Sequence, residues 1–194
     1  DTLLLHLPKD MPRPKLYLET GRALVDEAGY LITSVLHGRH SGDGRQSLVV
    51  DAGINLLYTA AWYKFDIQPA QPHTTPVGPT TLYGPLCMNI DVVRQEVYLP
   101  SMSPGQKLVI HPVGAYNITQ SMQFITYRPA VVMIGCNGEV DVIRRAENLH
   151  HVEALEELPE RMQVKEKPVK NGKRQNGTNG VNRIRTAVVD ASRT

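Results

Sequence analysis

Short β-prone segments separated by turn-forming residues run through most of this 194-residue sequence and constrain its fold more than any other feature. Their spacing is typical of strands in a β-sandwich or an open barrel. Seven strands are predicted, at residues 30–36, 47–51, 80–83, 96–99, 107–112, 130–135 and 139–144. Cys136-Asn137-Gly138 supplies a hairpin turn between the last two. The sequence therefore predicts a mainly β fold.

Helical patterns lie near the two ends of the sequence. Lys15–Glu19 is predicted to form a short strand, followed by a helix over residues 22–28 that ends at Gly29. A second helix is predicted over residues 148–161, where leucine and valine recur at helical spacing. These elements predict an α+β, mainly β chain in four parts: residues 1–29, a β-sandwich domain over 30–147, a C-terminal helix over 148–162 and a disordered basic tail over 163–194.

Composition and charge exclude several classes of protein. Hydrophobic residues make up 41% and charged residues 21% of the sequence, as in ordinary globular proteins. The net charge of +2 gives no reason to expect a nucleic-acid partner, and no apolar run approaches the ~20 residues of a membrane span. A secretory signal is absent from the sequence, and two cysteines form no disulfide framework. We therefore expect a cytoplasmic protein.

Basic charge is concentrated in the tail. Residues 163–194 hold eight Lys or Arg residues against two acids, with repeated Asn-Gly pairs and few large apolar residues. A basic stretch of this kind is a possible tether to nucleic acid or to a membrane. The low apolar content favours a solvated, disordered tail instead.

Four short clusters carry the functional signal: Glu19-Thr20-Gly21-Arg22, Asp51-Ala52-Gly53, Gly84-Pro85-Leu86-Cys87 with Asp91, and Gly114-Ala115-Tyr116. The first lies on a strand-to-helix turn, where a glycine permits close approach of a ligand and a guanidinium suits a phosphate. The order and spacing of the clusters resemble the fold-type III pyridoxal 5'-phosphate (PLP) decarboxylases, the family of ornithine and diaminopimelate decarboxylases. The resemblance runs from about residue 15 to about residue 146.

The resemblance implies a fold, a cofactor and an assembly. Residues 1–29 would be the last βα unit of a (β/α)8 barrel, and a β-sandwich domain would follow. The cofactor would be PLP and the enzyme a homodimer with shared active sites. The chain would be the C-terminal half of a longer protein, because no lysine in it has the context of the lysine that holds PLP.

The resemblance also assigns roles to single residues. Glu19 would face the pyridine nitrogen of PLP and favour its protonated form. Gly21, Arg22 and Tyr116 would hold the phosphate group. Taken alone, Glu19 is equally a carboxylate at a helix start, and Tyr116 a half-buried core aromatic.

Cys87 matches an active-site cysteine that reaches into the neighbouring subunit. After CO₂ leaves, a proton must return to the correct carbon, and a positioned thiol can supply or govern that proton. The structural alternative is a small buried apolar residue. Asp91 completes the segment and is expected to serve at the subunit interface rather than in chemistry.

Two departures from the family pattern bear on the substrate. Met88 stands where ornithine and diaminopimelate decarboxylases carry an acid, and Thr59 stands where the latter carry an arginine that grips a carboxylate. Tyr63, a tyrosine expected to line the substrate site, is retained. These residues predict an amino-acid substrate with an uncharged or conjugated distal group.

Two other functions stay open, and one kind of site is not indicated. A PLP-dependent racemase has the same overall architecture, and a catalytically inactive relative would bind a partner protein instead. The histidines do not have metal-ligand spacing; His150 and His151, for example, are adjacent. No metal site is expected.

Overall fold

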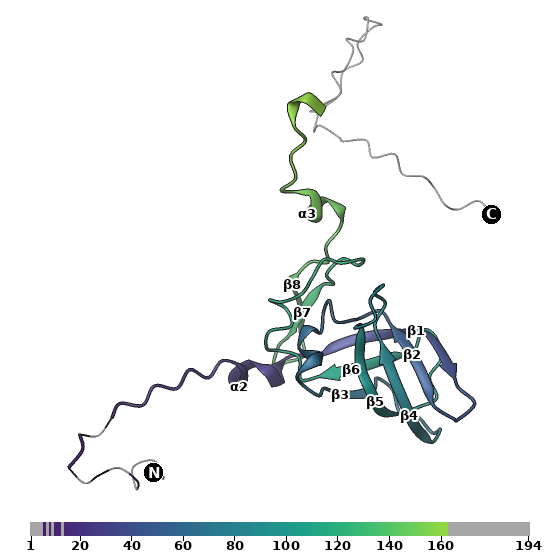
Figure 1. Cartoon of the computed structure of the whole chain (residues 1–194), viewed down its shortest axis with the longest axis horizontal. Coiled ribbons are helices and arrows are strands. Elements are labelled where there is room, and N and C mark those ends of the chain that lie inside the picture. Colours follow the sequence, from purple (N-terminus) through teal and green to yellow (C-terminus); the bar gives the residue numbers. More distant parts are fainter. Residues whose placement is uncertain (1–5, 7, 9, 13, 163–194) are drawn as a thin grey trace, which may run out of the picture. The chain divides into compact units, whose positions relative to one another are not determined.

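The computed structural model describes residues 6, 8, 10–12 and 14–162 (Figure 1). The chain divides into two compact units, Asp1–Leu155 and Glu156–Thr194. The predicted four-part division remains a prediction, and the predicted tail over 163–194 lies outside the described residues.

A six-stranded mixed sheet forms the body of the first unit (Figure 1). Its strands are β1 (Leu31–His40), β2 (Gln46–Val50), β3 (Asp66–Pro69), β4 (Val77–Tyr83), β5 (Val92–Pro100) and β6 (Lys107–His111). They lie in the order β3-β6-β1-β2-β4-β5. The β2–β4 pair is parallel and all other pairs are antiparallel.

Strand β1 belongs to both halves of this sheet. Leu31–Ser34 pairs with β6, whereas Val35–His40 pairs with β2. The register shifts between Val35 and His37, and an irregularity of this kind bends a strand.

Alternate residues of the strands point into one hydrophobic core, as the two-residue period of a strand requires. In β2, Leu48 and Val50 are fully buried, and in β6 Leu108 and Ile110 are. The core consists of Val35, Leu48, Val50, Leu57, Phe65, Ile67, Leu82, Val93, Leu99, Met102, Leu108, Ile110 and Val113. The expected mainly β, sandwich-type fold is confirmed by these elements.

The segment before the sheet differs in part from its prediction. The predicted helix over residues 22–28 is present as α2 (Arg22–Val25) followed by a 3-10 turn, η1 (Asp26–Ala28). Residues 15–19 are extended and exposed but form no strand, so this prediction is wrong for the described chain. A strand needs a neighbour for its backbone hydrogen bonds, and none of the described residues pairs with this segment.

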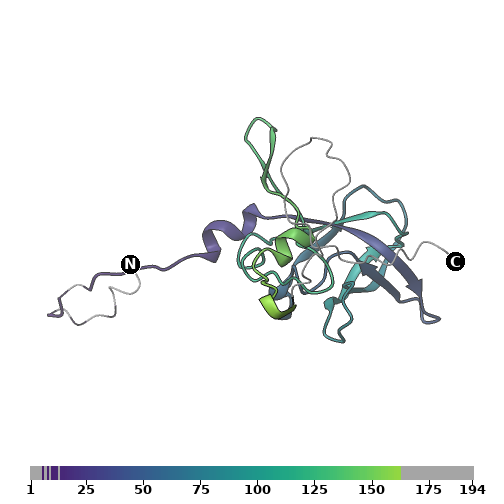
Figure 2. The ribbon, with the colours of Figure 1, turned by 90° about the horizontal axis from the view of Figure 1, so that it is seen from above.

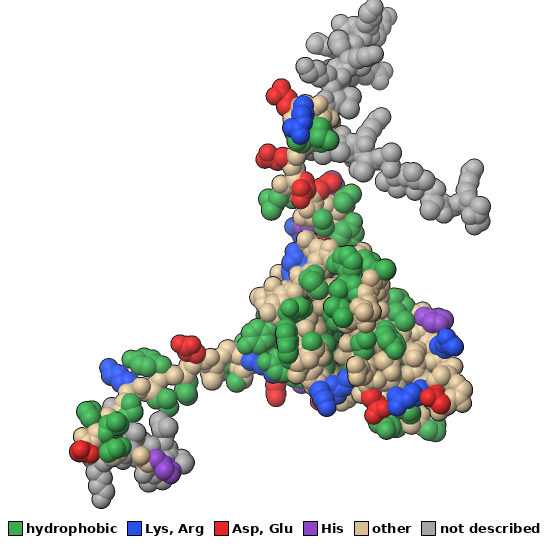
Figure 3. Space-filling view, viewed as in Figure 1, with side chains coloured by type: hydrophobic (Ala, Val, Ile, Leu, Met, Phe, Trp, Pro, Cys, Tyr) green, Lys and Arg blue, Asp and Glu red, His purple; other side chains and the backbone are tan. Residues whose placement is uncertain are grey.

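A separate hairpin follows the sheet. Strands β7 (Val131–Ile134) and β8 (Val140–Arg144) pair antiparallel around a turn in which Gly138 has a φ of +86°. Figure 2 shows the hairpin extending away from the six-stranded sheet. Its apolar side chains are exposed on both faces. Figure 3, viewed as Figure 1, shows hydrophobic side chains at the surface in the region of β7 and β8. The exposed residues are Val132, Met133, Ile134, Val140, Val142 and Ile143.

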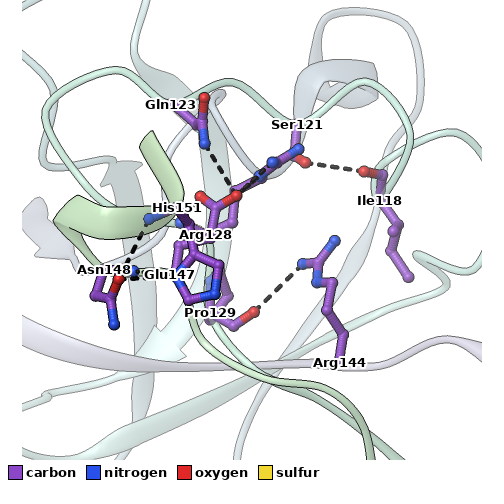
Figure 4. Close-up of polar contacts among 9 residues, drawn as sticks. All are labelled: Ile118, Ser121, Gln123, Arg128, Pro129, Arg144, Glu147, Asn148 and His151. Atoms are coloured by element: carbon purple, nitrogen blue, oxygen red, sulfur yellow. Dashed lines mark hydrogen bonds and ion pairs between the residues drawn. The ribbon is translucent and has the colours of Figure 1, made fainter. Parts of the chain in front are cut away.

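An ion pair closes the base of the hairpin. Arg128, just before β7, donates from Nε to Oε1 of Glu147, just after β8, at 2.7 Å (Figure 4). The Arg128 amide donates to Oε2 of the same carboxylate at 3.0 Å, and the Gln123 side chain donates to Oε1 at 2.9 Å. The hydrogen bond from Arg128 lowers the pKa of Glu147 to about 2, against a smaller opposing effect of burial.

This pKa predicts a pH-dependent contribution to stability. Because the pKa of Glu147 lies below the value of 4.5 expected without these partners, its contribution is present above about pH 4.5 and is lost as pH falls toward 2. We expect Glu147→Gln to lower the melting temperature of the full-length protein near neutral pH, and the difference from wild type to shrink as pH falls through this range.

The control for this measurement is Asp141→Asn, which changes an exposed acid on β8 that makes no ion pair with a described residue. A difference for Glu147→Gln that stays constant with pH would show that the carboxylate charge does not stabilise the hairpin.

The second predicted helix is shorter than expected. Helix α3 covers only Leu149–Glu153, with Asn148 and His151 forming a capping box (Figure 4). The 3-10 turn η3 (Glu160–Met162) belongs to the second unit. Pro159 disfavours helix at the preceding residue, and Leu155 is 93% exposed, so little packing supports a longer helix. Among the described residues, no helix has the length and apolar character to cross a membrane.

Candidate cofactor-binding site

Arg22 is held on two sides. Its Nε donates to Oδ2 of Asp26, one helical turn later, at 2.5 Å. Its guanidinium carbon lies 3.4 Å from the centroid of the Tyr63 ring, which is a cation–π arrangement. The hydrogen bond with Asp26 raises the pKa of Arg22, with burial acting in the opposite direction. The guanidinium therefore has a defined position before any ligand binds.

Asp26 also joins the first cluster to the last. Its Oδ1 accepts a hydrogen bond from the Ala115 amide at 3.2 Å, and its backbone carbonyl accepts one from the Gly114 amide at 2.9 Å. The side chain is buried, with the whole residue 8% exposed. Residues about 90 positions apart in sequence are thereby brought side by side. The predicted shared phosphate site remains a prediction.

Tyr116 lies in a braced turn. Its φ is +66°, a left-handed conformation that costs a non-glycine residue energy, and its side chain is 47% exposed. The buried Asn117 side chain donates to the carbonyls of Val113 and Ala115 at 3.3 Å. Its Oδ1 accepts from the Thr59 hydroxyl at 3.0 Å. Thr59 is thus a buried brace for the Tyr116 turn.

Glu19 and Gly21 belong to the first cluster, next to Arg22. Both are exposed, and Glu19 makes no hydrogen bond or ion pair with another described residue. A methyl group on Gly21 would meet nothing within 4 Å, so the backbone there is free for close approach of a ligand. The described residues bring together Arg22, Tyr63 and the Gly114–Tyr116 turn, and the predicted role of Glu19 remains a prediction.

The Cys87 segment is fixed by Asp91. One carboxylate oxygen of Asp91 accepts from the Leu86 amide at 2.7 Å, and the other accepts from the Ile54 amide at 2.8 Å. Asp91 is 3% exposed, and any side chain at Gly84 would overlap it. Asp91 therefore ties the second cluster to the third, with both oxygens used within the chain. The role expected for it at a subunit interface remains a prediction.

Cys87 itself is exposed. The interpretation of this cysteine as a small buried apolar residue is wrong for this chain, because the turn braced by Asp91 presents it at the surface. An exposed thiol is available to a reaction partner.

Two of these residues were missed in the sequence, although signals existed. Asp26 follows Arg22 at i+4, the spacing of a helical ion pair. Asn117 directly follows the Gly114–Tyr116 cluster, and asparagine side chains commonly bond to nearby backbone in turns.

Among the described residues, neither a groove nor a cluster of metal-ligating side chains marks a second candidate site. A groove of about 480 Å³ near the end of β3 and the start of β4 contains none of the predicted site residues. Within the described part of the chain, no group of three or more His, Cys, Asp or Glu side chains is arranged to hold a metal ion.

Comparison with known proteins identifies the family. Residues 23–114 match the family described as pyridoxal-dependent decarboxylase, C-terminal sheet domain. The diaminopimelate decarboxylase of Helicobacter pylori is 34% identical over 143 residues, which cover 72% of this chain and 35% of that protein. The chain belongs to the fold-type III pyridoxal-dependent decarboxylases. It corresponds to their C-terminal portion.

Other relatives agree. The Escherichia coli diaminopimelate decarboxylase is 32% identical over 158 residues, which cover 74% of this chain and 37% of that protein. A solved diaminopimelate decarboxylase from M. jannaschii, in co-complex with L-lysine, superposes with a TM-score of 0.69 at 28% identity, over 78% of this chain and 35% of that one. The chain thus spans about a third of the length of these relatives.

The relatives contradict one expectation. Their names specify diaminopimelate, an amino acid with a second charged amino-acid group at its far end. The predicted uncharged or conjugated distal group was inferred from Met88 and Thr59. The structure weakens half of that inference, because Thr59 is buried against Asn117 and serves the turn rather than an open substrate site.

The residues present fit the phosphorylated cofactor that the family name implies. Arg22 binds Asp26 through Nε and also interacts with Tyr63. A guanidinium has five N–H donors, so these two partners leave donors available to an anion. The Tyr116 hydroxyl likewise has no hydrogen-bond partner among the described residues and lies on a half-exposed side chain. A guanidinium and a phenol are suitable donors to a phosphate group.

Proposed function

We propose that this chain forms the C-terminal part of a PLP-dependent amino-acid decarboxylase. The observation that carries the proposal is the link made by Asp26, which joins the Arg22 guanidinium to the Gly114–Tyr116 turn. The two clusters that would hold one phosphate group lie about 90 positions apart in sequence and are neighbours in the fold. Family membership supports the reaction class.

PLP would supply an electron sink for the electrons released when the carboxylate leaves. Arg22, Gly21 and Tyr116 would hold its phosphate group and leave its reactive end free. Glu19 would lie against the pyridine nitrogen and keep a proton there, because a nearby negative charge favours the protonated form. None of these residues needs to touch the bond that breaks.

Cys87 would act in the later step of the reaction, after CO₂ has left. We propose that its exposed thiol governs the return of a proton to the α-carbon in the active site of a second subunit, which requires a homodimer with shared sites. The hydrogen bond between Asp91 and the Leu86 amide would fix the position of the thiol for that transfer. The ring of Tyr63 would line the edge of the substrate site.

For the substrate, we propose a diamino acid, with diaminopimelate as the first compound to assay. The relatives' names support this choice, and L-lysine, found with the M. jannaschii protein, is diaminopimelate after loss of one CO₂. Met88 supplies no charge for the distal group, so that charge would be met by other residues.

The test is an assay of the purified full-length protein. We expect a PLP absorption band, and release of CO₂ from diaminopimelate with L-lysine as the product. Loss of optical activity without CO₂ would instead show a racemase. A protein with neither a PLP band nor turnover would show a catalytically inactive relative, and either result would refute the proposal.

A further inference from the structure

Asp26 has a combination of contacts that its position in a short 3-10 turn does not require. Its two carboxylate oxygens bind different partners, Arg22 Nε at 2.5 Å and the Ala115 amide at 3.2 Å. Its backbone carbonyl binds the Gly114 amide at 2.9 Å. A single buried residue thus controls the separation between the guanidinium and the turn that carries Tyr116.

The bond to Asp26 also determines which part of Arg22 is left for a ligand. Asp26 occupies Nε, and the ring of Tyr63 covers one face of the guanidinium. Tyr63 is also a hydrogen-bond partner of the guanidinium. The guanidinium has five N–H donors, so donors remain for a ligand beside these two partners. An arginine restrained on one edge and one face loses less conformational freedom when it binds an anion.

We propose that Asp26 is a positioning residue for cofactor phosphate, which sets Arg22 and the Tyr116 turn at the separation that one phosphate group needs. This inference rests on the proposed PLP-binding function. Two effects of the Asp26 carboxylate oppose each other. Its negative charge repels a phosphate dianion, whereas its hydrogen bonds preorganise the donors.

Preorganisation is the larger effect in this geometry, because the Asp26 charge is paired directly with Arg22 at 2.5 Å. The net repulsion felt by a phosphate beyond that pair is small. Removing the carboxylate should therefore weaken phosphate binding rather than strengthen it.

The experiment compares two cofactor forms with the full-length protein. PLP and pyridoxal share the ring and the aldehyde, and only PLP carries the phosphate. Dissociation constants for both are measured by absorbance titration for wild type and Asp26→Asn. Asparagine keeps the size of the side chain, but it has a single acceptor oxygen and cannot serve both Arg22 and Ala115.

We expect Asp26→Asn to weaken PLP binding by about tenfold, the scale of losing one charge-assisted hydrogen bond, and to change pyridoxal binding by less than about twofold. The control is Glu27→Gln, which changes the neighbouring acid in the same turn, one whose side chain makes no hydrogen bond with a described residue. Its PLP and pyridoxal affinities should match those of wild type.

Equal weakening of both cofactor forms would show a general structural role and overturn the inference. Tighter PLP binding by the variant would show that repulsion dominates, and would overturn it as well. If Asp26→Asn does not fold, Tyr63→Leu removes the other restraint on Arg22 and should give the same selective loss for PLP. Failure of the wild-type protein to bind either form would instead refute the proposed function.

Discussion

Replacement of Glu19 by alanine in the full-length protein is expected to lower the rate of decarboxylation by about 100-fold or more, the scale seen when one preorganised electrostatic partner is removed. Without the carboxylate, the pyridine nitrogen loses the negative charge that favours its protonated form. PLP binding should persist, because the phosphate contacts are proposed to come from Arg22 and Tyr116. The measurements are CO₂ release at saturating substrate and the PLP absorption band.

The matched control for this variant is Glu27→Ala, which removes an exposed acid five residues after Arg22. Its turnover should equal that of wild type. Unchanged turnover in Glu19→Ala would refute the role proposed for the carboxylate, even if the protein binds PLP. Loss of PLP from Glu19→Ala would show that Glu19 contributes to cofactor binding as well as to protonation of the pyridine nitrogen.

The strands were the most predictable part of the fold, because their alternating pattern and bounding turns are local signals. All seven predicted strands in residues 30–144 are present, with altered ends. Strand β1 continues to His40, beyond the predicted end at residue 36, because its second half pairs with β2 after the shift at Val35. A polar pattern such as His37–His40 gives no local sign of this pairing.

Strand β3 was not predicted. It has four residues, ends in Pro69 and forms an edge of the sheet beside β6. A proline is tolerated at an edge because its missing amide is not needed there, but in sequence it argues against a strand. The helix predicted over residues 148–161 is present only at Leu149–Glu153. Its periodicity was correct, but little of the described chain packs against it.

The site shows the same division between local and tertiary information. The clusters around Arg22, Cys87 and Tyr116 were identified because each is a short continuous pattern. The residues that hold these clusters together, Asp26 and Asn117, were not identified from the sequence. Their partners Ala115 and Thr59 are distant in sequence and come near only in the fold. Asp91 is intermediate: its place in the third cluster was noted, and its contact with the Ile54 amide needed the structure.

The close contact between Gly114 and the helix before the sheet predicts a second large effect. A methyl group at Gly114 would overlap the Val25 carbonyl oxygen and lie 2.8 Å from that of Asp26. Both obstacles are backbone atoms, so no side-chain rotation relieves the clash. Gly114→Ala must therefore displace either the α2–η1 segment or the Tyr116 turn, and the cost of such overpacking is about 1–3 kcal/mol, occasionally more.

We expect the displacement to affect function, because the hydrogen bonds from Gly114 and Ala115 to Asp26 connect the two clusters that are proposed to bind phosphate. We expect Gly114→Ala in the full-length protein to lower the melting temperature and to weaken PLP binding by about tenfold or more, since more than one charge-assisted contact is disturbed. Gly42→Ala is the matched control: a methyl group there meets nothing within 4 Å, so stability and affinity should both match wild type. If Gly114→Ala lowers stability but leaves PLP affinity unchanged, the two clusters do not share one phosphate group, because the separation that Asp26 maintains would then have no effect on the ligand.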